Sequence, residues 1–121
     1  MYHKIGHKNF SLLEKMLDLH AAKHRVIAQN IVNVNTPHYR RRVFRFDSAL
    51  RDAMSKGHSS DYNTIQGWVE RPNTTPVRNN GNNVDLEMEM VSLKENATAY
   101  EIYTSLYSKK SQMVKAAIRG Q

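Results

Sequence analysis

Apolar residues recur with four-three spacing near the start of the chain. The stretch from Ser11 to about Asn33 contains neither Gly nor Pro, so this spacing produces one stripe along a helix. The pattern predicts an N-terminal helix over residues 11–35, which must end before Pro37 because proline disfavours helical backbone in the residue before it. The stripe consists of Leu13, Leu17, His20, His24, Ile27, Ile31 and Val34, broadened by Leu12, Met16 and Leu19.

The same spacing returns over the last third of the chain and predicts a C-terminal helix over residues 84–119. Acidic residues fill the expected first turns and basic residues the last, which suits the helix dipole, and Asn83 is a candidate N-cap. Gly120 is the expected stop. The stripe consists of Leu86, Met90, Leu93, Ala97, Tyr100, Thr104, Tyr107, Ser111, Val114 and Ile118.

The middle segment, residues 36–83, has a weaker pattern. Arg40 to Phe46 reads as extended, and a short amphipathic helix is predicted over 47–56. Residues 58–83 are poor in apolar side chains and rich in Asn, Thr, Gly and Pro. They are expected to form a mobile loop, with a possible β-hairpin around Gly67.

These elements predict a mainly α fold, a single unit spanning residues 1–121 in which two long terminal helices form a coiled-coil-like pair, parallel or antiparallel. We expect an N-terminal set to pack against a C-terminal set within the chain. Flanking apolar residues would stay partly exposed, which indicates assembly with other subunits. The packing residues are Leu13, Leu17, Ile27 and Ile31 on one helix and Leu86, Leu93, Tyr100, Tyr107 and Val114 on the other; the flanks are Leu12, Met16 and Leu19, and Ile102, Leu106 and Met113.

Composition narrows the function. The 121 residues include no Cys, which excludes disulfides, Cys-ligated zinc and thiol catalysis. No run is long enough to cross a bilayer, and the start has no continuous apolar region of the kind found in a cleavable signal peptide. The net charge of +7 arises in residues 1–56, which hold 11 basic and 4 acidic residues, and this excess suggests an acidic partner surface.

Candidate catalytic and metal-binding groups have simpler interpretations. His20 and His24 have the spacing of two ligands on one helix face, but no third ligand accompanies them. Asp85, Glu87 and Glu89 lie two apart on a predicted helix, so they point in different directions, and dipole complementarity explains them. There is no nucleophile constellation, phosphate loop or dinucleotide fingerprint. We therefore expect no enzyme, no metal, no cofactor and no small-molecule substrate.

Four arginines, Arg40, Arg41, Arg42 and Arg45, form the most basic run. Clustered guanidinium groups bind phosphates well, so a basic helical nucleic-acid-binding protein is the alternative function. No groove-reading module accompanies the run, and a solvated or subunit-facing basic strand is the preferred interpretation, with no nucleic acid expected.

The sequence Ala28-Gln29-Asn30-Ile31-Val32-Asn33-Val34-Asn35-Thr36-Pro37-His38-Tyr39 forms the exit of the first predicted helix. It resembles the N-terminal signature A-x-N-I-A-N-x-x-T-P-G-Y of bacterial flagellar rod, hook and hook-associated proteins. Its motif residues are Asn30, Asn33, Thr36, Pro37 and Tyr39. The segments 46–50 and 80–89 resemble the F-x-x-x-L and D-G-N-x-V-D-x-x-x-E patterns of proximal rod members of that family.

His38 and Val32 stand where the signature has Gly and Ala. His adopts a positive φ less readily than Gly, so this substitution argues against a left-handed backbone at the corner. Val32 adds volume where helices of the family are close together.

The resemblance implies a structural, non-enzymatic subunit of the flagellar basal-body rod, which crosses the periplasm and transmits torque to the hook. It implies homo-oligomeric contacts within the rod and export by the flagellar type III apparatus without a cleavable signal peptide. The implied partners are other rod subunits, the junction of membrane ring and export gate, and the rod adapter protein FliE.

Overall fold

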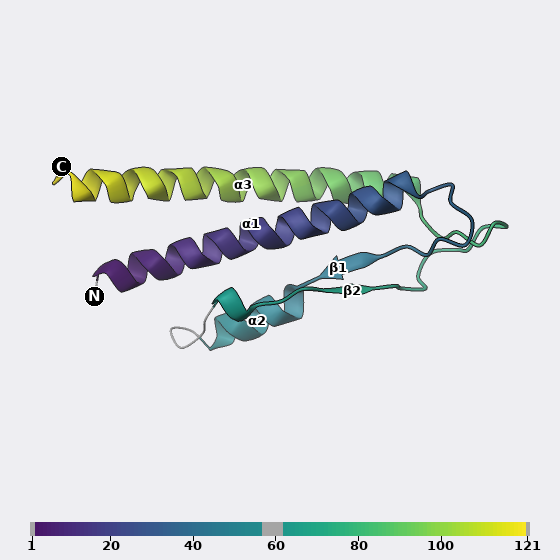
Figure 1. Ribbon diagram of the computed structural model, residues 1–121, viewed down its shortest axis with the longest axis horizontal. Coiled ribbons are helices and arrows are strands. Elements are labelled where there is room, and N and C mark those ends of the chain that lie inside the picture. Colours follow the sequence, from purple (N-terminus) through teal and green to yellow (C-terminus); the bar gives the residue numbers. More distant parts are fainter. Residues whose placement is uncertain (1, 57–61, 121) are drawn as a thin grey trace.

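A computed structural model describes residues 2–56 and 62–120, with side chains from Phe10 onward. The order of elements is α1 (Tyr2–Val32), β1 (Val43–Arg45), α2 (Asp47–Ser55), the 3-10 turn η2 (Tyr62–Thr64), β2 (Trp68–Glu70) and α3 (Leu86–Ile118), as Figure 1 shows. The predicted mainly helical fold, with two long terminal helices and a short one between them, is confirmed.

The two long helices run side by side and antiparallel, with both chain ends at the same end of the molecule (Figure 1). At about 1.5 Å per residue, α1 is about 46 Å long and α3 about 50 Å. α1 begins at Tyr2, nine residues before the predicted start, and the ring of Phe10 in this added part meets that of Tyr107 at 5.2 Å. No helix in the described ranges is both long and apolar enough to cross a membrane.

α1 is the central layer, with α3 on one side and the middle segment on the other (Figure 1). Met16 and Leu19 of α1 form the core with Phe46, Ala53 and Ile65 of the middle segment. These two α1 residues are buried, so the expectation that this flank of α1 stays exposed for other subunits is wrong. The reason is that α2 and η2 fold back over it and remove its apolar surface from water.

The middle segment is held by a two-stranded antiparallel ribbon in which Phe44 pairs with Val69. The predicted hairpin around Gly67 is wrong, because β2 pairs with the earlier extended segment and not with its own neighbour. Gly67 lies under the Phe44 ring, where an added Cβ would approach the ring to 2.1 Å. The mobility expected for this loop stays a prediction, and its residues 58–61 lie outside the described ranges.

The buried line of α3 is rotated away from the predicted stripe. Leu86 and Tyr100 are 45 and 42% exposed, although they were predicted to pack against the first helix, and Met90 of the same stripe is 52% exposed. Glu89 and Asn96 are buried in their place. Both make polar contacts that pull this side of α3 inward, Glu89 to Arg41 and Asn96 to the backbone of α1. Of the other predicted packing residues, Ile27 is buried, and Leu13, Leu17, Ile31, Leu93, Tyr107 and Val114 are half-buried.

We predict that Ile65→Ala will lower the free energy of unfolding by about 2 to 5 kcal/mol, the usual range for truncation of a buried aliphatic side chain. Ile65 is 4% exposed in the core between η2 and α1. Val77→Ala is the control, since Val77 is 52% exposed in the same middle segment. Urea denaturation measures both, and equal midpoints would contradict the packing of the middle segment on α1.

Candidate functional site

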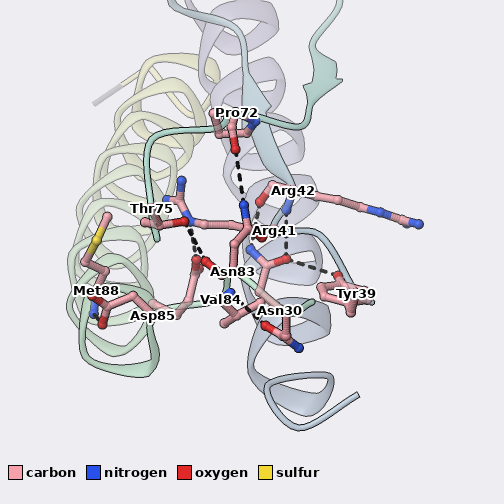
Figure 2. Close-up of polar contacts among 12 residues, drawn as sticks. Asn30, Tyr39, Arg41, Arg42, Pro72, Thr75, Asn83, Val84, Asp85 and Met88 are labelled. Atoms are coloured by element: carbon pink, nitrogen blue, oxygen red, sulfur yellow. Dashed lines mark hydrogen bonds and ion pairs between the residues drawn. The ribbon is translucent and has the colours of Figure 1, made fainter. Parts of the chain in front are cut away.

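The candidate site is the corner where α1 ends and α3 begins. Here the last carbonyl groups of α1 have no partner within the helix, and the chain must also turn twice, so many polar groups need partners. Asn30 and Tyr39 of the signature lie here near Asn83 and Val84 of the segment before α3 (Figure 2). Asn82 of that segment also bonds to Asn33 and Thr36 of the signature.

Asn30 is fully buried in the last turns of α1 and binds the segment that leads into β1. Its Nδ2 donates to the carbonyl of Arg42 at 2.7 Å, and its Oδ1 accepts from the Arg42 amide at 3.0 Å. The same oxygen accepts from the Tyr39 hydroxyl at 3.0 Å (Figure 2). One side-chain amide therefore pairs with both backbone groups of a residue on the next segment, as a neighbouring strand would.

The turn that follows α1 is built from side chains of the signature. Asn33 donates from Nδ2 to the Gln29 carbonyl at 2.8 Å, and its Oδ1 accepts from the Thr36 hydroxyl at 3.0 Å. Pro37 comes next, five residues after the last residue of α1, and its ring prevents the helix from resuming there. His38 has φ of 63°, and its amide donates to the Asn80 carbonyl at 2.9 Å. The expectation that histidine argues against a positive φ at this position is therefore wrong.

Asn82 closes the end of α1 from the other side of the corner. Its Nδ2 donates to the carbonyls of Asn33 and Thr36, both at 2.8 Å, and its Oδ1 accepts from the Val84 amide at 2.7 Å. Arg78 adds hydrogen bonds to the Val34 and Val84 carbonyls. The segment before α3 thus closes the turn that follows α1, which binds the two long helices together at this end.

Asn83 ties a third segment to the corner. Its Oδ1 accepts from the Arg41 amide at 2.5 Å, its Nδ2 donates to the Pro72 carbonyl at 3.4 Å, and its own carbonyl accepts from the Thr75 hydroxyl at 2.5 Å (Figure 2). The predicted role of Asn83 as the N-cap is wrong. Asp85 caps α3, because its carboxylate accepts from the Met88 amide at 3.2 Å.

A buried ion pair completes the corner. Nε of Arg41 lies 2.6 Å from Oε1 of Glu89, and the two side chains are 12% and 1% exposed. The sequence position of Glu89 indicated only that it complements the helix dipole. The structure shows that it also forms a buried ion pair. Burial raises the pKa of the Tyr39 hydroxyl and nearby Glu89 adds to this, while Arg42 and Arg71 act in the opposite direction.

The arginine run divides into four different environments. Arg41 is in the buried pair, and Arg45 binds Glu70 at 2.6 Å on the surface of the ribbon. The Arg42 guanidinium lies 5.8 Å from the centre of the Tyr39 ring, and Arg40 is exposed. The interpretation as one solvated or subunit-facing strand is thus wrong for Arg41, whose side chain lies in the buried pair, while Arg45 is a solvated residue of β1.

The two histidines considered as metal ligands lie in different surroundings. His20 is buried between the Phe46 and Tyr103 rings, and its Nδ1 donates to the Met16 carbonyl at 2.7 Å, while His24 is exposed. Next to it, Asn96 donates to the His20 carbonyl at 2.7 Å. In the described part of the chain, no three His, Cys, Asp or Glu side chains gather as a metal site would require.

The structure brings together Asn30, Asn33, Thr36 and Tyr39 around the turn at Pro37. The residues that sequence reasoning missed are their partners Arg41, Arg78, Asn82 and Glu89. Asn82 belongs to the Asn-rich segment that resembles the entry to the C-terminal helix. This resemblance was the only feature of the sequence that could have identified Asn82 as a site residue. Nothing in the pattern assigned its side chain to the end of the first helix.

We predict that Asn82→Ala will lower the free energy of unfolding by about 1 to 3 kcal/mol, because the buried Val84 amide and the part-buried carbonyls of Asn33 and Thr36 would lose their partner. Asn79→Ala, on the exposed side of the same turn, is the control and should change stability by less than about 0.5 kcal/mol. Thermal unfolding and amide exchange at Val84 measure the effect. Unchanged exchange at Val84 would contradict the capping role.

For the ion pair we expect an asymmetry. Arg41→Leu should lower the free energy of unfolding by about 3 to 5 kcal/mol, because it strands a carboxylate that is almost fully buried. Glu89→Leu should cost less, since Arg41 keeps access to solvent, and the double substitution should recover part of the loss. A double-mutant cycle in urea tests this, and additive losses would count against a coupled pair.

No protein-family model matches the chain. Curated relatives do match along most of it. The chain is 27% identical over 126 residues to the flagellar basal body rod protein FlgB of Borrelia hermsii, a match that covers 89% of this chain and 93% of that protein. It is 28% identical over 117 residues to FlgB of Bacillus subtilis, covering 89% of the chain and 91% of that protein. FlgB of Aquifex aeolicus is 25% identical over 121 residues, with 94% and 95% covered.

Each of these matches covers at least 89% of the chain and at least 91% of the relative. The resemblance drawn from the motif is confirmed, and the proteins to which this chain is similar along most of its length are flagellar basal body rod proteins named FlgB.

Proposed function

We propose that the chain is a structural subunit of the flagellar basal-body rod, which self-assembles with other rod proteins into the periplasmic driveshaft and transmits torque from motor to hook. The similarity to FlgB proteins supports the rod assignment. The observation that carries the assembly role is the apolar surface of α3, since α1 covers one side of this helix and leaves the rest to water.

Most of the exposed large apolar side chains in the described residues lie on α3. Apolar surface of this extent on one element usually marks a contact with another protein. Neighbouring subunits that cover α3 would build a tube if each contact joined two different faces, because such contacts do not close. The exposed residues are Leu86, Met88, Met90, Val91, Tyr100, Ile102, Leu106, Met113 and Ile118.

The partners and location follow from this role. The chain would contact further copies of itself, other rod subunits, the adapter FliE and the junction of membrane ring and export gate. It would be exported by the flagellar type III apparatus. The exposed apolar surface of α3 supports the homo-oligomeric part of this proposal, and the relatives' name supports the basal-body location.

The proposed role is not enzymatic. In the corner, the buried amides and the Arg41–Glu89 pair bind one another or backbone groups, which leaves these groups to hold the fold and not to attack a substrate. The alternative of nucleic-acid binding has no support, because Arg41 and Arg45 of the basic run already bind carboxylates.

The first experiment is immunodetection of the chain in purified hook and basal-body particles from its own bacterium, after removal of membrane and soluble protein. We expect it to co-purify with the rod at a few copies per particle. Its absence from intact particles would overturn the proposed function.

A matched pair of substitutions tests the α3 surface. Met90 and Met54 are 52% and 56% exposed, on α3 and α2 respectively. We expect Met90→Asp to leave the chain folded, because the site is exposed, but to reduce its incorporation into particles and abolish swimming by burying a charge between subunits. Met54→Asp should preserve both. Equal incorporation and equal swimming of the two variants would contradict assembly through α3.

A further inference from the structure

One face of α3 combines exposed apolar residues with charges of both signs. Ile102 is 54% exposed and precedes Tyr103, which is turned toward the core. Because successive helix residues are about 100° apart, Ile102 lies more than a quarter turn from the side that α1 covers. We call its surroundings the Ile102 face. It contains Val91, Glu95, Thr98, Ile102, Leu106, Lys109 and Met113, all exposed.

The Ile102 face is hollowed at its centre. An open depression there is lined by Thr98, Glu101, Ile102, Ser105, Leu106 and Lys109. Apolar atoms provide most of its surface, and a second apolar side chain could enter it. The middle of the face therefore has the shape and chemistry of a small contact site.

Charge is segregated along α3. From its cap at Asp85 to Glu101 there are five acidic residues and one Lys, while residues 102–119 hold four basic residues and no acid. The helix dipole accounts for charges in the first and last turn, since its effect falls off beyond them. Glu95 and Lys109 lie more than two turns from the nearer end, so the dipole does not explain their positions.

The charges and apolar residues are arranged symmetrically about Ile102. Glu95 lies seven residues before it and Lys109 seven after; Val91 lies eleven before it and Met113 eleven after. Seven residues make almost two helical turns, which keeps these positions on one face. A second copy of α3, turned around a two-fold axis at Ile102, would place each Glu95 beside Lys109 of the other copy. Val91 and Met113 would meet at both outer ends.

We propose that two copies of the free chain associate through their Ile102 faces as an antiparallel dimer. A second copy is the occupant that this pattern fits, because the face is complementary to itself only after a two-fold rotation. A parallel copy in register would set Glu95 against Glu95 and Lys109 against Lys109. The contact closes at two copies, and with one helix face per chain it is small and therefore weak. It does not depend on the proposed rod function.

Charge reversal tests the pairing of Glu95 with Lys109. Sedimentation equilibrium of the full chain should show a monomer–dimer equilibrium that weakens with salt. Glu95→Lys alone and Lys109→Glu alone should each weaken the dimer about tenfold or more, because both symmetry-related pairs become repulsive. The doubly substituted chain should dimerise as the original does. Lys115→Glu, with the same change in charge on another side of α3, is the control and should leave the dimer unchanged.

Mixing the two singly substituted chains is the sharpest arm of this experiment. In an antiparallel heterodimer each altered residue faces an opposite charge, so the mixture should dimerise about as tightly as the original chain and more tightly than either variant alone. Circular dichroism confirms that each chain is folded. Failure of the mixture to dimerise, a monomer at all concentrations, or open-ended oligomers would each overturn the proposal.

Cross-linking tests the two-fold axis independently. The chain has no Cys, so Ile102→Cys introduces a single thiol, and the axis would bring two of these thiols together. Mild oxidation should convert this variant to a disulfide-linked dimer faster than Thr104→Cys, whose exposed position is about 160° away around the helix after two residues. Equal rates for the two variants would overturn the assignment of the Ile102 face.

Discussion

The need to pair the carbonyl groups of the turn after α1 organises the corner, and the corner holds the two long helices together. Backbone carbonyls outside a helix need partners of their own where water does not reach them fully. Asn82 and Arg78 donate to the carbonyls of Asn33, Val34 and Thr36 in this turn, from the segment that leads into α3. Because these donors lie more than forty residues further along the chain, the turn after one helix is completed by the segment before the other. Asn30 does the same for the strand segment by pairing with both backbone groups of Arg42.

This arrangement explains why polar side chains, and not apolar ones, decide how α3 faces α1. Glu89 and Asn96 lie buried against α1 or the corner, although larger apolar residues occur nearby on the same helix. A buried hydrogen bond or ion pair is costly to leave unmade, so its partners fix the rotation of the helix. The apolar surface that is displaced from the interface then remains on the outside of α3, where the assembly proposal needs it.

The parts of the fold that sequence could predict are those with a long, regular pattern. Both terminal helices, the short helix after Phe46 and the stop before Pro37 follow from periodicity and proline chemistry, and the structure has them. The periodic pattern did not predict which face of each helix is buried, because contacts between distant segments decide this. Met16 and Leu19 looked available for other subunits, because nothing local shows that α2 and η2 return to cover them.

The corner was predictable in position but not in its partners. The signature located the turn, whereas the bonds of Asn82 to Asn33 and Thr36 join segments far apart in sequence, which periodicity does not address. His38 illustrates the same limit: histidine does not favour a positive φ, and the His38 amide donates a hydrogen bond to the carbonyl of Asn80, which is 42 residues further along the chain. The fact that the signature has Gly at this position gives no indication of the hydrogen bond to Asn80.

Both chain ends lie at the end of the helix pair opposite the corner, so the two helices are joined by the chain at one end only (Figure 1). Near the free end the described contacts between α1 and α3 include the ring pair of Phe10 and Tyr107 and the exposed bond from Tyr107 to Glu14, with no buried amide among them. A small change at the corner in the angle between α1 and α3 would therefore displace the start of α1 and the end of α3 more than any other part of the two helices. Fluorophores attached to the two ends would therefore read out that angle by energy transfer.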